Sequence, residues 1–500
     1  RFDIATGATG RNHGLLHSGA RYAVTDQESA TECIKENMIL KKIARHCVDD
    51  TSGLFITLPE DDLAYQDTFV KACLAAGINA EVIDPEEAKR MEPSVNPTLI
   101  GAVKVPDGSV DPFRLCASNV FDAKIHGAKV LVYSEVIEFI KEQDTIKGVK
   151  VLDHHTGIVT DYYAPVTVNA GGIWGHHIAQ MAGANISMFP AKGALLIFAH
   201  RVNSVVINRC RKPANADILV PGDTVCVIGT TSTRVPYEEC DHLKVTPDEV
   251  DLLLTEGAKL APCLAETRVL RAYAGVRPLV SADNDPSGRN ISRGIVCLDH
   301  ESRDGIKGFI SITGGKLMTY RLMGEMAADA VCKKLGRDAK CVTADTPLPG
   351  SEPGGIEEIS KKIWEVPTMV QKASVGRFGT QAAKLDFDGD VKGSLVCECE
   401  EVSVSEVDSA IENLEVNNLV DLRRRTRFGM GTCQGELCAC RAAGRLAKAR
   451  KCTSKARADL KDFMNERWKG MYPVAWGETL RESAYTQWVY SEVMGLGEEI

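Results

Sequence analysis

The stretch GFISITGGKLMTYRLMGEMAADAVCKKLG, residues 308 to 336, has the pattern of a strand, a tight glycine turn and a helix. Its first six residues are mostly apolar and β-branched, which is typical of a buried strand. After Gly314 and Gly315, small and apolar residues recur at helical spacing as far as Val331. Glycines let a ligand approach the main chain, and the free N–H groups at a helix start attract an anion or an electron-rich ring. Alone, the stretch fits a ligand-binding turn and a structural turn with a solvated Lys316 equally well.

A second stretch repeats this pattern. The strand-like run APVTVNA, residues 164 to 170, leads into VNAGGIWG, where Gly171 and Gly172 precede a helix expected near Trp174. Short β-rich runs alternate with helical ones through most of the chain before residue 345. This alternation predicts an α/β fold with additional sheet structure.

The chain changes character after residue 345. TPLPGSEPGGIEE, residues 346 to 358, has proline and glycine at the density of a linker, and the pattern beyond it is almost wholly helical. We therefore predict four parts. They are an α/β domain over residues 1–345, a linker and helical connection over 346–392, a small helical cysteine domain over 393–450 and a helical tail over 451–500.

One helix start is marked near the N-terminus. Thr25 and Glu28 have the spacing of a capping box in front of a long amphipathic segment. We expect Thr25 to cap a helix that runs to about Cys47.

Composition excludes several classes of protein. With 500 residues, two or three domains are expected. The net charge of −9 argues against nucleic acid as a partner, since that function needs clustered basic charge. No apolar run approaches the roughly 18 residues of a membrane span. The 17 cysteines are too irregularly spaced for a disulfide scaffold, so most are expected to be buried free thiols.

The N-terminal stretch IATGATGRNHGLLHSGARY, residues 4 to 22, is rich in both glycine and polar side chains. Glycines alternate there with hydrogen-bonding residues such as Thr6, Thr9, Asn12, His13 and His17. A purely structural loop would not need so many donors. We interpret the stretch as a loop that wraps a polar cofactor.

Two close pairs of cysteines mark the C-terminal part. LVCECE contains Cys397 and Cys399, and MGTCQGELCACR contains Cys433 and Cys438, with Cys440 as a spare that could replace Cys438. Four thiolates can hold either a structural zinc ion or an iron–sulfur cluster. The spacing alone does not choose between them.

Taken together, these motifs resemble a known family. ATGATGRNHGLLHSGARYA, VNAGGIWG, GTTSTR (229–234), YAGVRPL (273–279) and ITGGKLMTYR look like the flavin-dependent glycerol-3-phosphate dehydrogenases of the D-amino-acid-oxidase superfamily. LVCECE and RRRTRFGMGTCQGELCACR resemble the catalytic subunits of the anaerobic, three-subunit bacterial group of that family. The resemblance extends over essentially the whole chain. It implies an FAD-binding oxidoreductase domain followed by a small helical cysteine domain.

The resemblance implies which residues contact FAD. Backbone N–H groups after the strand at 308–313 would face the flavin pyrimidine edge and stabilise the anionic reduced ring. The residues expected at the cofactor are Thr6, Thr9, Asn12, His13, Gly14, Val136, Ala170, Gly171, Trp174, Gly314, Gly315 and Leu317.

The resemblance also implies a substrate, glycerol 3-phosphate, which is oxidised to dihydroxyacetone phosphate by hydride transfer to FAD. The residues expected to bind it are Arg21, Tyr22, Arg277 and Lys316. Several cations suit a phosphate dianion better than the single carboxylate of an amino acid. His17, Arg277 and Lys316 are the expected catalytic residues. Since Leu195 occupies the position of a histidine found in aerobic relatives, His17, His13 and Lys316 all remain candidates for the base.

For the cysteines, the resemblance is to [2Fe–2S] domains of the bacterioferritin-associated-ferredoxin type. Cys397, Cys399, Cys433 and Cys438 are the expected ligands. The basic run from Arg423 to Arg427 either neutralises an anionic cluster or forms a solvated helix face.

The resemblance implies partners and a location as well. Electrons would pass through two further subunits, one of them a membrane-associated iron–sulfur protein, to a membrane quinone. The chain would be cytoplasmic and held at the inner membrane by those partners. Residues 463–500, which concentrate Trp468, Trp476, Trp488 and Tyr490, are a candidate docking segment. Two alternatives stay open, an amine or amino-acid dehydrogenase of the same superfamily and a non-catalytic iron–sulfur scaffold.

One departure from the family yields a prediction. The G-x-G-x-x-G turn that cradles the FAD pyrophosphate, with its first strand, helix and second strand, does not occur in residues 1–500. We therefore expect this stretch alone, lacking the first βαβ unit, to bind FAD weakly, and a chain with that unit to bind it well. The flavin-to-protein ratio after gel filtration measures this. Tight, stoichiometric flavin on residues 1–500 would contradict it.

Overall fold

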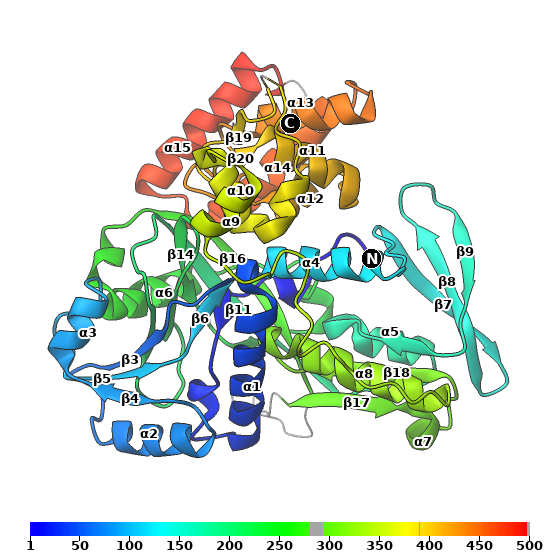
Figure 1. The fold of residues 1–500 in the computed structure, drawn as a ribbon, viewed down its shortest axis with the longest axis horizontal. Coiled ribbons are helices and arrows are strands. Elements are labelled where there is room, and N and C mark those ends of the chain that lie inside the picture. The colour runs from blue at the N-terminus through cyan, green and yellow to red at the C-terminus, as the bar shows by residue number, and fades with distance from the viewer. Residues whose placement is uncertain (281–293, 390, 498–500) are drawn as a thin grey trace.

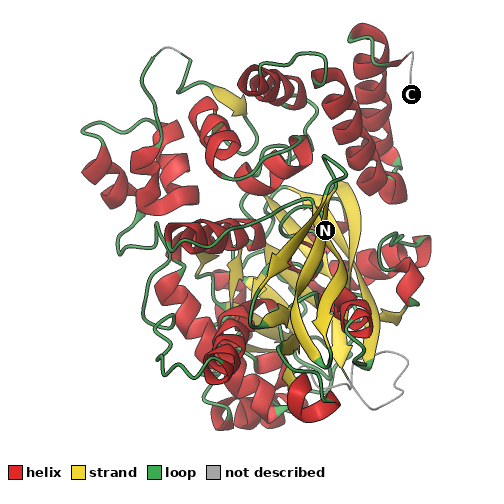
Figure 2. Cartoon of the chain, turned by 90° about the vertical axis from the view of Figure 1, so that its right-hand side faces the viewer, coloured by secondary structure: helices red, strands yellow, loops and turns green. Residues whose placement is uncertain are grey.

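The computed structural model describes residues 1–280, 294–389 and 391–497, in a larger part and a smaller helical part (Figure 1). The smaller part contains the chain from α9 onward and sits on one side of the larger part, as the second view also shows (Figure 2). An α/β part followed by a mainly helical part confirms the predicted fold class in outline. None of the helices within these described ranges is long and apolar enough to cross a membrane.

A nine-stranded mixed sheet forms the body of the larger part, with the order β15-β11-β14-β13-β12-β3-β5-β4 and β16 paired to β11. Its strands are β3 (Gly53–Thr57), β4 (Glu81–Ile83), β5 (Gly101–Val105), β11 (Met188–Ala199), β12 (Val206–Arg209), β13 (Ile218–Pro221), β14 (Val225–Gly229), β15 (Thr233–Arg234) and β16 (Val269–Val280). The longest pairing joins β11 and β16, which run antiparallel from Met188↔Val280 to Phe198↔Val269. These two strands therefore set the direction of the whole sheet.

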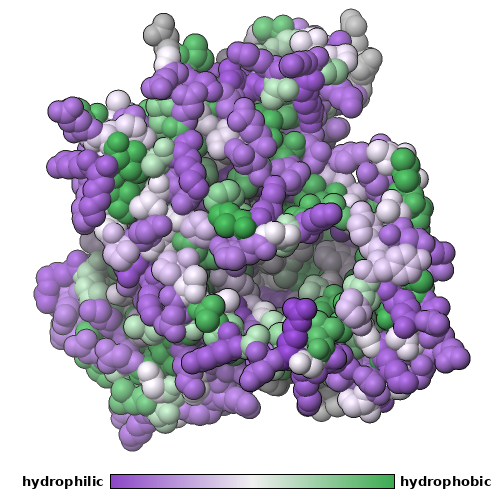
Figure 3. Space-filling model, turned by 45° about the vertical axis from the view of Figure 1, so that its right-hand side comes forward, coloured by the Kyte–Doolittle hydropathy of each residue, from purple (hydrophilic) through white to green (hydrophobic). Residues whose placement is uncertain are grey.

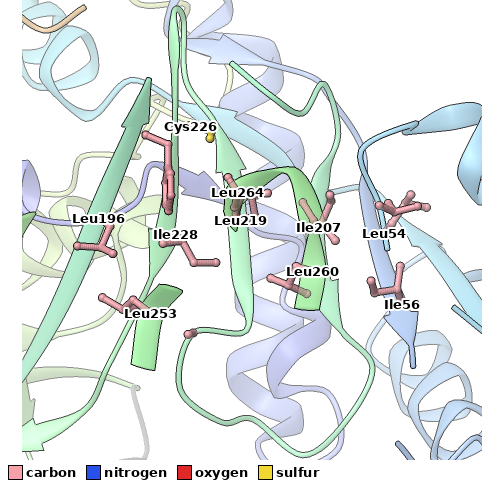
Figure 4. Close-up of a cluster of buried hydrophobic side chains, with 14 of the residues drawn as sticks. Leu54, Ile56, Leu196, Ile207, Leu219, Cys226, Ile228, Leu253, Leu260 and Leu264 are labelled. Atoms are coloured by element: carbon pink, nitrogen blue, oxygen red, sulfur yellow. The ribbon is translucent and has the colours of Figure 1, made fainter. Parts of the chain in front are cut away.

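Helix α6 (Pro247–Leu260) covers one face of this sheet and closes the main hydrophobic core (Figure 4). Leu253 and Leu260 of the helix meet strand residues such as Ile207 and Ile228, and all four side chains are fully buried. Burying one such side chain contributes about 1.5–3 kcal/mol to folding. The core thus holds the sheet rigidly beneath the loops at its ends.

The two predicted strand–glycine–helix segments lie side by side in a smaller sheet of order β10-β18-β17. β10 (Thr167–Asn169) runs parallel to β18 (Phe309–Gly314), which pairs antiparallel with β17 (Ile295–Asp299). Each of the first two strands leads through glycines into a helix, α5 (Gly175–Met181) or α8 (Tyr320–Lys334). Residues 317–319, expected at the start of that last helix, form a separate 3-10 turn.

The remaining elements of the larger part surround these sheets. They are β1 (Leu15–Leu16), β2 (Val48–Asp49), β6 (Gly108–Val110), β7 (Ser134–Glu142), β8 (Thr145–Asp153), β9 (Val159–Tyr163), α1 (Gln27–Ile43), α2 (Tyr65–Ala75), α3 (Pro85–Met91), α4 (Pro112–Ile125) and α7 (His300–Asp304). The start of α1 corrects one expectation. Asp26, not Thr25, caps the helix, because the Asp26 carboxylate accepts the Ser29 N–H at 3.1 Å. A carboxylate one residue later takes the capping role that the Thr25 pattern indicated.

The smaller part packs helices around its own core. Its elements are α9 (Ile356–Ile363), α10 (Met369–Phe378), α11 (Val404–Asn413), α12 (Leu419–Thr426), α13 (Ala439–Arg450), α14 (Ala456–Met471), α15 (Gly477–Trp488) and the short strands β19 (Leu395–Cys397) and β20 (Val402–Ser403). The β19–β20 pair was not expected in a segment predicted to be almost wholly helical. Phe428 and Phe463 stack at 5.2 Å in the centre of this core, close to the cysteines.

The basic run on α12 joins the two parts through buried ion pairs. Arg424 and Arg425 both donate to the carboxylate of Asp3 at 3.0 Å, and Arg427 donates to Asp111 at 2.8 Å. These arginines lie against carboxylates of the larger part because a buried guanidinium needs an acceptor. The interpretation of the run as a solvated helix face is therefore wrong.

The C-terminal tail also enters the larger part. Val474 is fully buried and belongs to the main core beneath the nine-stranded sheet. The hydroxyl of Thr479 donates to the Val269 carbonyl, at the start of β16. The tail therefore completes the packing of the larger part as well as of the smaller one.

A buried acidic pair at this interface predicts a pH-dependent stability. The buried carboxylate of Asp421 accepts the Tyr133 hydroxyl at 3.0 Å and lies beside Asp3. Burial, and then the Asp3 charge, raise the pKa of Asp421 to about 7. The folded chain therefore holds a proton that the unfolded chain has released, between about pH 4 and pH 7. The contribution of Asp421 to the free energy of unfolding therefore falls as the pH rises through that window.

Asp421→Asn removes this titration. Relative to the wild type, we expect the gain in Tm of this variant to grow between about pH 4 and pH 7 and to be largest at the upper end of that window. Differential scanning calorimetry measures it, and the exposed Glu87→Gln serves as the matched control. A wild-type pH dependence of Tm in Asp421→Asn would show that another group carries the effect.

Candidate active site and cysteine centre

A cavity of about 740 Å³ lies where the N-terminal loop meets the glycine turns after β10 and β18 and one end of β16. Its walls include Thr6, Thr9, Asn12, His13, His17, Arg21, Tyr22, Ala170, Gly171, Trp174, Thr230, Gly275, Arg277, Thr313, Gly314, Gly315, Lys316 and Leu317. Segments more than 300 residues apart in sequence thus share one site. The surface view shows that the molecule is deeply hollowed on one face (Figure 3).

Glycines bring main chain to the wall of this cavity. Gly314 and Gly315 have φ values of 78° and 65°, in the left-handed region that side chains disfavour. A Cβ on Gly275 would lie 2.4 Å from the carbonyl oxygen of Arg11, so β16 and the N-terminal loop touch through their backbones. The turn after β18 therefore depends on glycine for its conformation, and the contact at Gly275 depends on glycine for space.

The hydrogen bonds of the two candidate histidines, His13 and His17, indicate the same imidazole tautomer. The Nδ1 atom of His13 accepts the Leu15 N–H at 3.1 Å, and the Nδ1 atom of His17 accepts the Gly19 N–H at 3.1 Å. A neutral imidazole whose Nδ1 is an acceptor has its proton on Nε2. Both rings therefore present Nε2 as a hydrogen-bond donor. The structure favours them as donors to an oxygen rather than as bases at Nε2.

Tyr22 links His17 to Lys316. The Tyr22 ring packs edge-on against the His17 ring at 5.1 Å, and the Lys316 ammonium lies over the same tyrosine ring at 5.1 Å. A cation over an aromatic face is held by the ring quadrupole. The three side chains thus form one wall with a positive charge at its end.

Arg277 enters the cavity from β16 and is held by the strand ends around it. Its Nη2 atom donates to the hydroxyl of Thr230 and, at 3.2 Å, to the carbonyl of Thr231. A Cβ on Gly193 would lie 2.7 Å from that Nη2 atom, so the glycine leaves room for the guanidinium. The position of Arg277 is therefore determined by its neighbours in the sheet.

Arg21 also lines the cavity, and it is ion-paired. Its Nη2 atom lies 3.1 Å from a carboxylate oxygen of Asp217 and 3.0 Å from the Ala214 carbonyl. Asp217 is fully buried and pairs with Arg211 as well. Arg211 is also paired with Glu256 at 3.0 Å. Asp217 therefore mainly fixes the position of Arg21 at the cavity.

Most residues predicted for the cofactor and substrate line this one cavity, and two do not. Gly14 borders a neighbouring smaller cavity, and Val136 lies in β7, away from both. Val136 stays a prediction for a part of the cofactor outside this cavity. The sequence analysis did not single out Gly193 or Thr230, although Thr230 lies within GTTSTR and Gly193 lies two residues before Leu195. Only the pairing of β11 with β14 and β16 brings these residues to Arg277.

The residues present fit an FAD-like group. The cavity lies within the usual size range for such sites, and its walls combine glycine backbone with cationic and hydroxyl side chains. The buried Oγ1 atom of Thr313, in the wall, has no hydrogen-bond partner among the described residues. A buried hydroxyl without a partner is costly, which favours a polar ligand at this wall.

The four predicted cysteine ligands meet at one place in the smaller part. The thiol of Cys433 interacts with those of Cys399 and Cys438, and Cys438 also with that of Cys397. These contacts, together with N–H groups of the loop before α13, lower the pKa of Cys433. Cys440 is turned away, because its sulfur lies 3.3 Å from that of Met494. The structure thus brings the predicted four together and leaves the spare cysteine outside.

This arrangement fits a group with two metal atoms. Cys399 contacts Cys433, Cys433 contacts Cys438, and Cys438 contacts Cys397, so the four thiols adjoin one another as a group of two irons with two thiolates each would require. Within the described residues, no three His, Cys, Asp or Glu side chains are arranged to hold a single metal ion.

Comparison with known families and proteins agrees with this geometry. The model of the FAD dependent oxidoreductase family matches residues 1–321, and that of the BFD-like [2Fe-2S] binding domain matches residues 395–446. The chain is 62% identical over 500 residues to the A subunit of anaerobic glycerol-3-phosphate dehydrogenase from Escherichia coli K12, covering 100% of this chain and 92% of that protein. It is 62% identical over 499 residues to the protein of that name from Haemophilus influenzae, covering 100% and 88%.

Among solved structures, the glycerol-3-phosphate dehydrogenase from Bacillus halodurans, complexed with FAD, superposes with a TM-score of 0.67. It covers 95% of this chain and 90% of that one at 19% identity, which shows a shared fold. The expected architecture, an FAD-binding oxidoreductase domain followed by a small [2Fe–2S] domain, is confirmed.

Proposed function

This chain belongs to the FAD dependent oxidoreductase family and, within it, to the anaerobic glycerol-3-phosphate dehydrogenases, and from that premise we propose that it oxidises glycerol 3-phosphate to dihydroxyacetone phosphate. The observation that supports this substrate most directly is the convergence of Arg277, Lys316 and Arg21 on the cavity that fits FAD. A phosphate dianion needs several charged donors, and each charge-assisted hydrogen bond contributes about 1.5–3 kcal/mol.

Each side chain has a distinct role in this proposal. Arg277 and Lys316 bind the phosphate and the glycerol oxygens, and Arg21, held in place by Asp217, adds a further hydrogen-bond donor. His17 donates from Nε2 to the oxygen on C2. Donation to that oxygen favours its ionised form, from which hydride leaves most readily, and the proton that the C2 hydroxyl loses passes to solvent. Bound FAD supplies the hydride acceptor. This role replaces the expectation that His17 acts as the base.

The two alternative functions lose support. A non-catalytic scaffold is inconsistent with membership of an oxidoreductase family over residues 1–321. The substrate of an amino-acid dehydrogenase would bring a single carboxylate, and that of an amine dehydrogenase none, into a cavity whose walls carry several cations. The cations match a dianion better.

We extend the proposal to the path of the electrons. They pass from the flavin site to a [2Fe–2S] cluster at Cys397, Cys399, Cys433 and Cys438 and leave through partner subunits to a membrane quinone. The names of the two relatives, each of which denotes one component of a larger enzyme, support a multi-subunit complex. The chain is then a cytoplasmic protein held at the inner membrane by those partners.

The C-terminal tail supplies a candidate docking surface. Trp468, Tyr472, Trp476, Tyr485 and Trp488 are between 46% and 69% exposed. Aromatic residues are enriched where subunits meet. Tyr490, by contrast, is buried in the core of the smaller part and takes no part in this surface.

The substrate proposal is tested on the complete, FAD-loaded protein. Glycerol 3-phosphate should bleach the flavin absorbance, whereas glycerol and amino acids should not. Arg277→Ala should raise the glycerol 3-phosphate concentration needed for half-maximal bleaching by at least about tenfold, since one charge-assisted hydrogen bond is lost. Flavin content should stay near that of the wild type.

Arg90→Gln, an exposed substitution on α3, is the control for the loss of one positive charge. If Arg277→Ala keeps the wild-type substrate dependence, Arg277 does not bind the substrate. Bleaching by an amino acid instead would overturn the proposed substrate.

Docking is tested by substitution rather than by truncation, because removing residues 463–500 would also remove the buried Phe463 and Val474. Tyr485→Ser with Trp488→Ser should abolish co-purification with partner subunits and quinone reduction. Substrate-dependent bleaching of flavin should persist. Tyr163→Ser, at an equally exposed aromatic on β9, is the control. Normal co-purification of the double variant would place the docking surface elsewhere.

A further inference from the structure

Three arginines donate to three consecutive residues of the loop that carries Cys433. Arg268 donates to the Thr432 carbonyl at 3.0 Å, and Arg467 to the Cys433 carbonyl at 3.4 Å. Arg271 donates to the side-chain oxygen of Gln434 at 3.3 Å. Arg268 and Arg271 come from the larger part, just before and within β16, and Arg467 comes from α14. The loop that carries Cys433 thus accepts hydrogen bonds from arginines of both the larger and the smaller part.

Arg271 differs from Arg467 in how its charge is balanced. Arg467 is paired with Glu482 at 2.6 Å. Arg271 is 7% exposed, and within the described ranges no carboxylate forms an ion pair with it. Burial lowers the pKa of Arg271, and the negative charge of Glu466 partly opposes this shift. Since an arginine keeps its proton in proteins, a buried positive charge lies beside the loop with incomplete compensation.

The chain makes space for this charge. A Cβ on Gly470 would lie 2.5 Å from the Nη2 atom of Arg271, so α14 can cross the guanidinium only at a glycine. Gln434, whose oxygen accepts from Arg271, is itself 2% exposed and donates its amide to the Met430 and Gly431 carbonyls at 2.9 Å. The amide of Gln434 therefore fixes the orientation of its oxygen toward Arg271.

A positive charge beside this loop affects the reduction potential of a cluster held by the four cysteines. Reduction of a [2Fe–2S] group adds one electron and one negative charge, with no bond formed or broken. Net charge and hydrogen bonding around the sulfurs are among the factors that set its reduction potential. A buried cation stabilises the more negative state, and low polarity strengthens the effect.

We propose that Arg271, assisted by Arg268, is a positioning residue that raises the reduction potential of the cluster at the four cysteines, so that the cluster accepts electrons from the flavin site. This inference rests on the proposed function, in which those cysteines hold a [2Fe–2S] group. Because both arginines belong to the β16 region, the large domain sets the redox property of a group held by the small one.

The test is an EPR-monitored redox titration of the complete, cluster-loaded protein. Arg271→Gln removes the charge, and Arg271→Lys keeps it. We expect the one-electron equilibrium for cluster reduction to weaken at least tenfold in Arg271→Gln, a fall of about 59 mV. Arg271→Lys should stay close to the wild type. Arg90→Gln, on the distant α3, should leave the potential unchanged.

Several results would overturn the proposal. One is an unchanged potential in Arg271→Gln at full iron and sulfide content, and another is an equal shift in Arg271→Lys, which would indicate packing rather than charge. Should Arg271→Gln lose the cluster, Arg268→Gln provides the measurement, and it must also lower the potential. Absence of iron and sulfide from the wild-type protein would refute the proposed cluster itself, which is a distinguishable failure.

Discussion

The alternation of side chains along β16 is the constraint on which the rest of the molecule depends. Because successive residues of a strand point to opposite faces, Arg271, Tyr273, Gly275 and Arg277 share one face. Arg271 meets the cysteine loop, the Tyr273 hydroxyl donates to the Asn12 carbonyl at 2.7 Å, and Gly275 touches the N-terminal loop. Arg277 reaches the cavity that fits an FAD-like group. One strand face therefore orders the two redox sites in space.

Ion pairs between the larger and the smaller part fix their relative position more specifically than apolar contacts would. Asp3 accepts from Arg424 and Arg425, so a carboxylate at the chain start holds a helix more than 400 residues away. Breaking such a buried pair leaves one charge without compensation, which costs several kcal/mol, on the order of 3–5. Because these ion pairs would break if the two parts moved relative to each other, the interface holds the parts in one arrangement. A fixed interface suits a protein whose two redox sites must keep a constant separation.

The sequence predicted the local elements well and the long-range partners poorly. The strand–glycine–helix segments at 164–181 and 308–334 were found because glycine turns and apolar periodicity are local signals. The partners of Arg424 and Arg427 could not be found, since pairing with Asp3 and Asp111 depends on how two domains dock. The histidines show the same limit. Their type suggested a base, whereas their backbone contacts, visible only in the fold, make Nε2 a donor. The four cysteines were expected together because of the resemblance to [2Fe–2S] domains, since residues 400–432 separate the two pairs in sequence.

Val474 has a consequence for the order in which the molecule is made. Synthesis proceeds from the N-terminus, and domains generally fold as they emerge. The main core beneath the nine-stranded sheet, however, includes this residue from the last part of the chain. Until the tail has left the ribosome, the position that Val474 fills in that core is empty and its apolar neighbours stay exposed. The oxidoreductase domain therefore reaches its final packing only after the cysteine domain, which precedes Val474 in the sequence, has been synthesised.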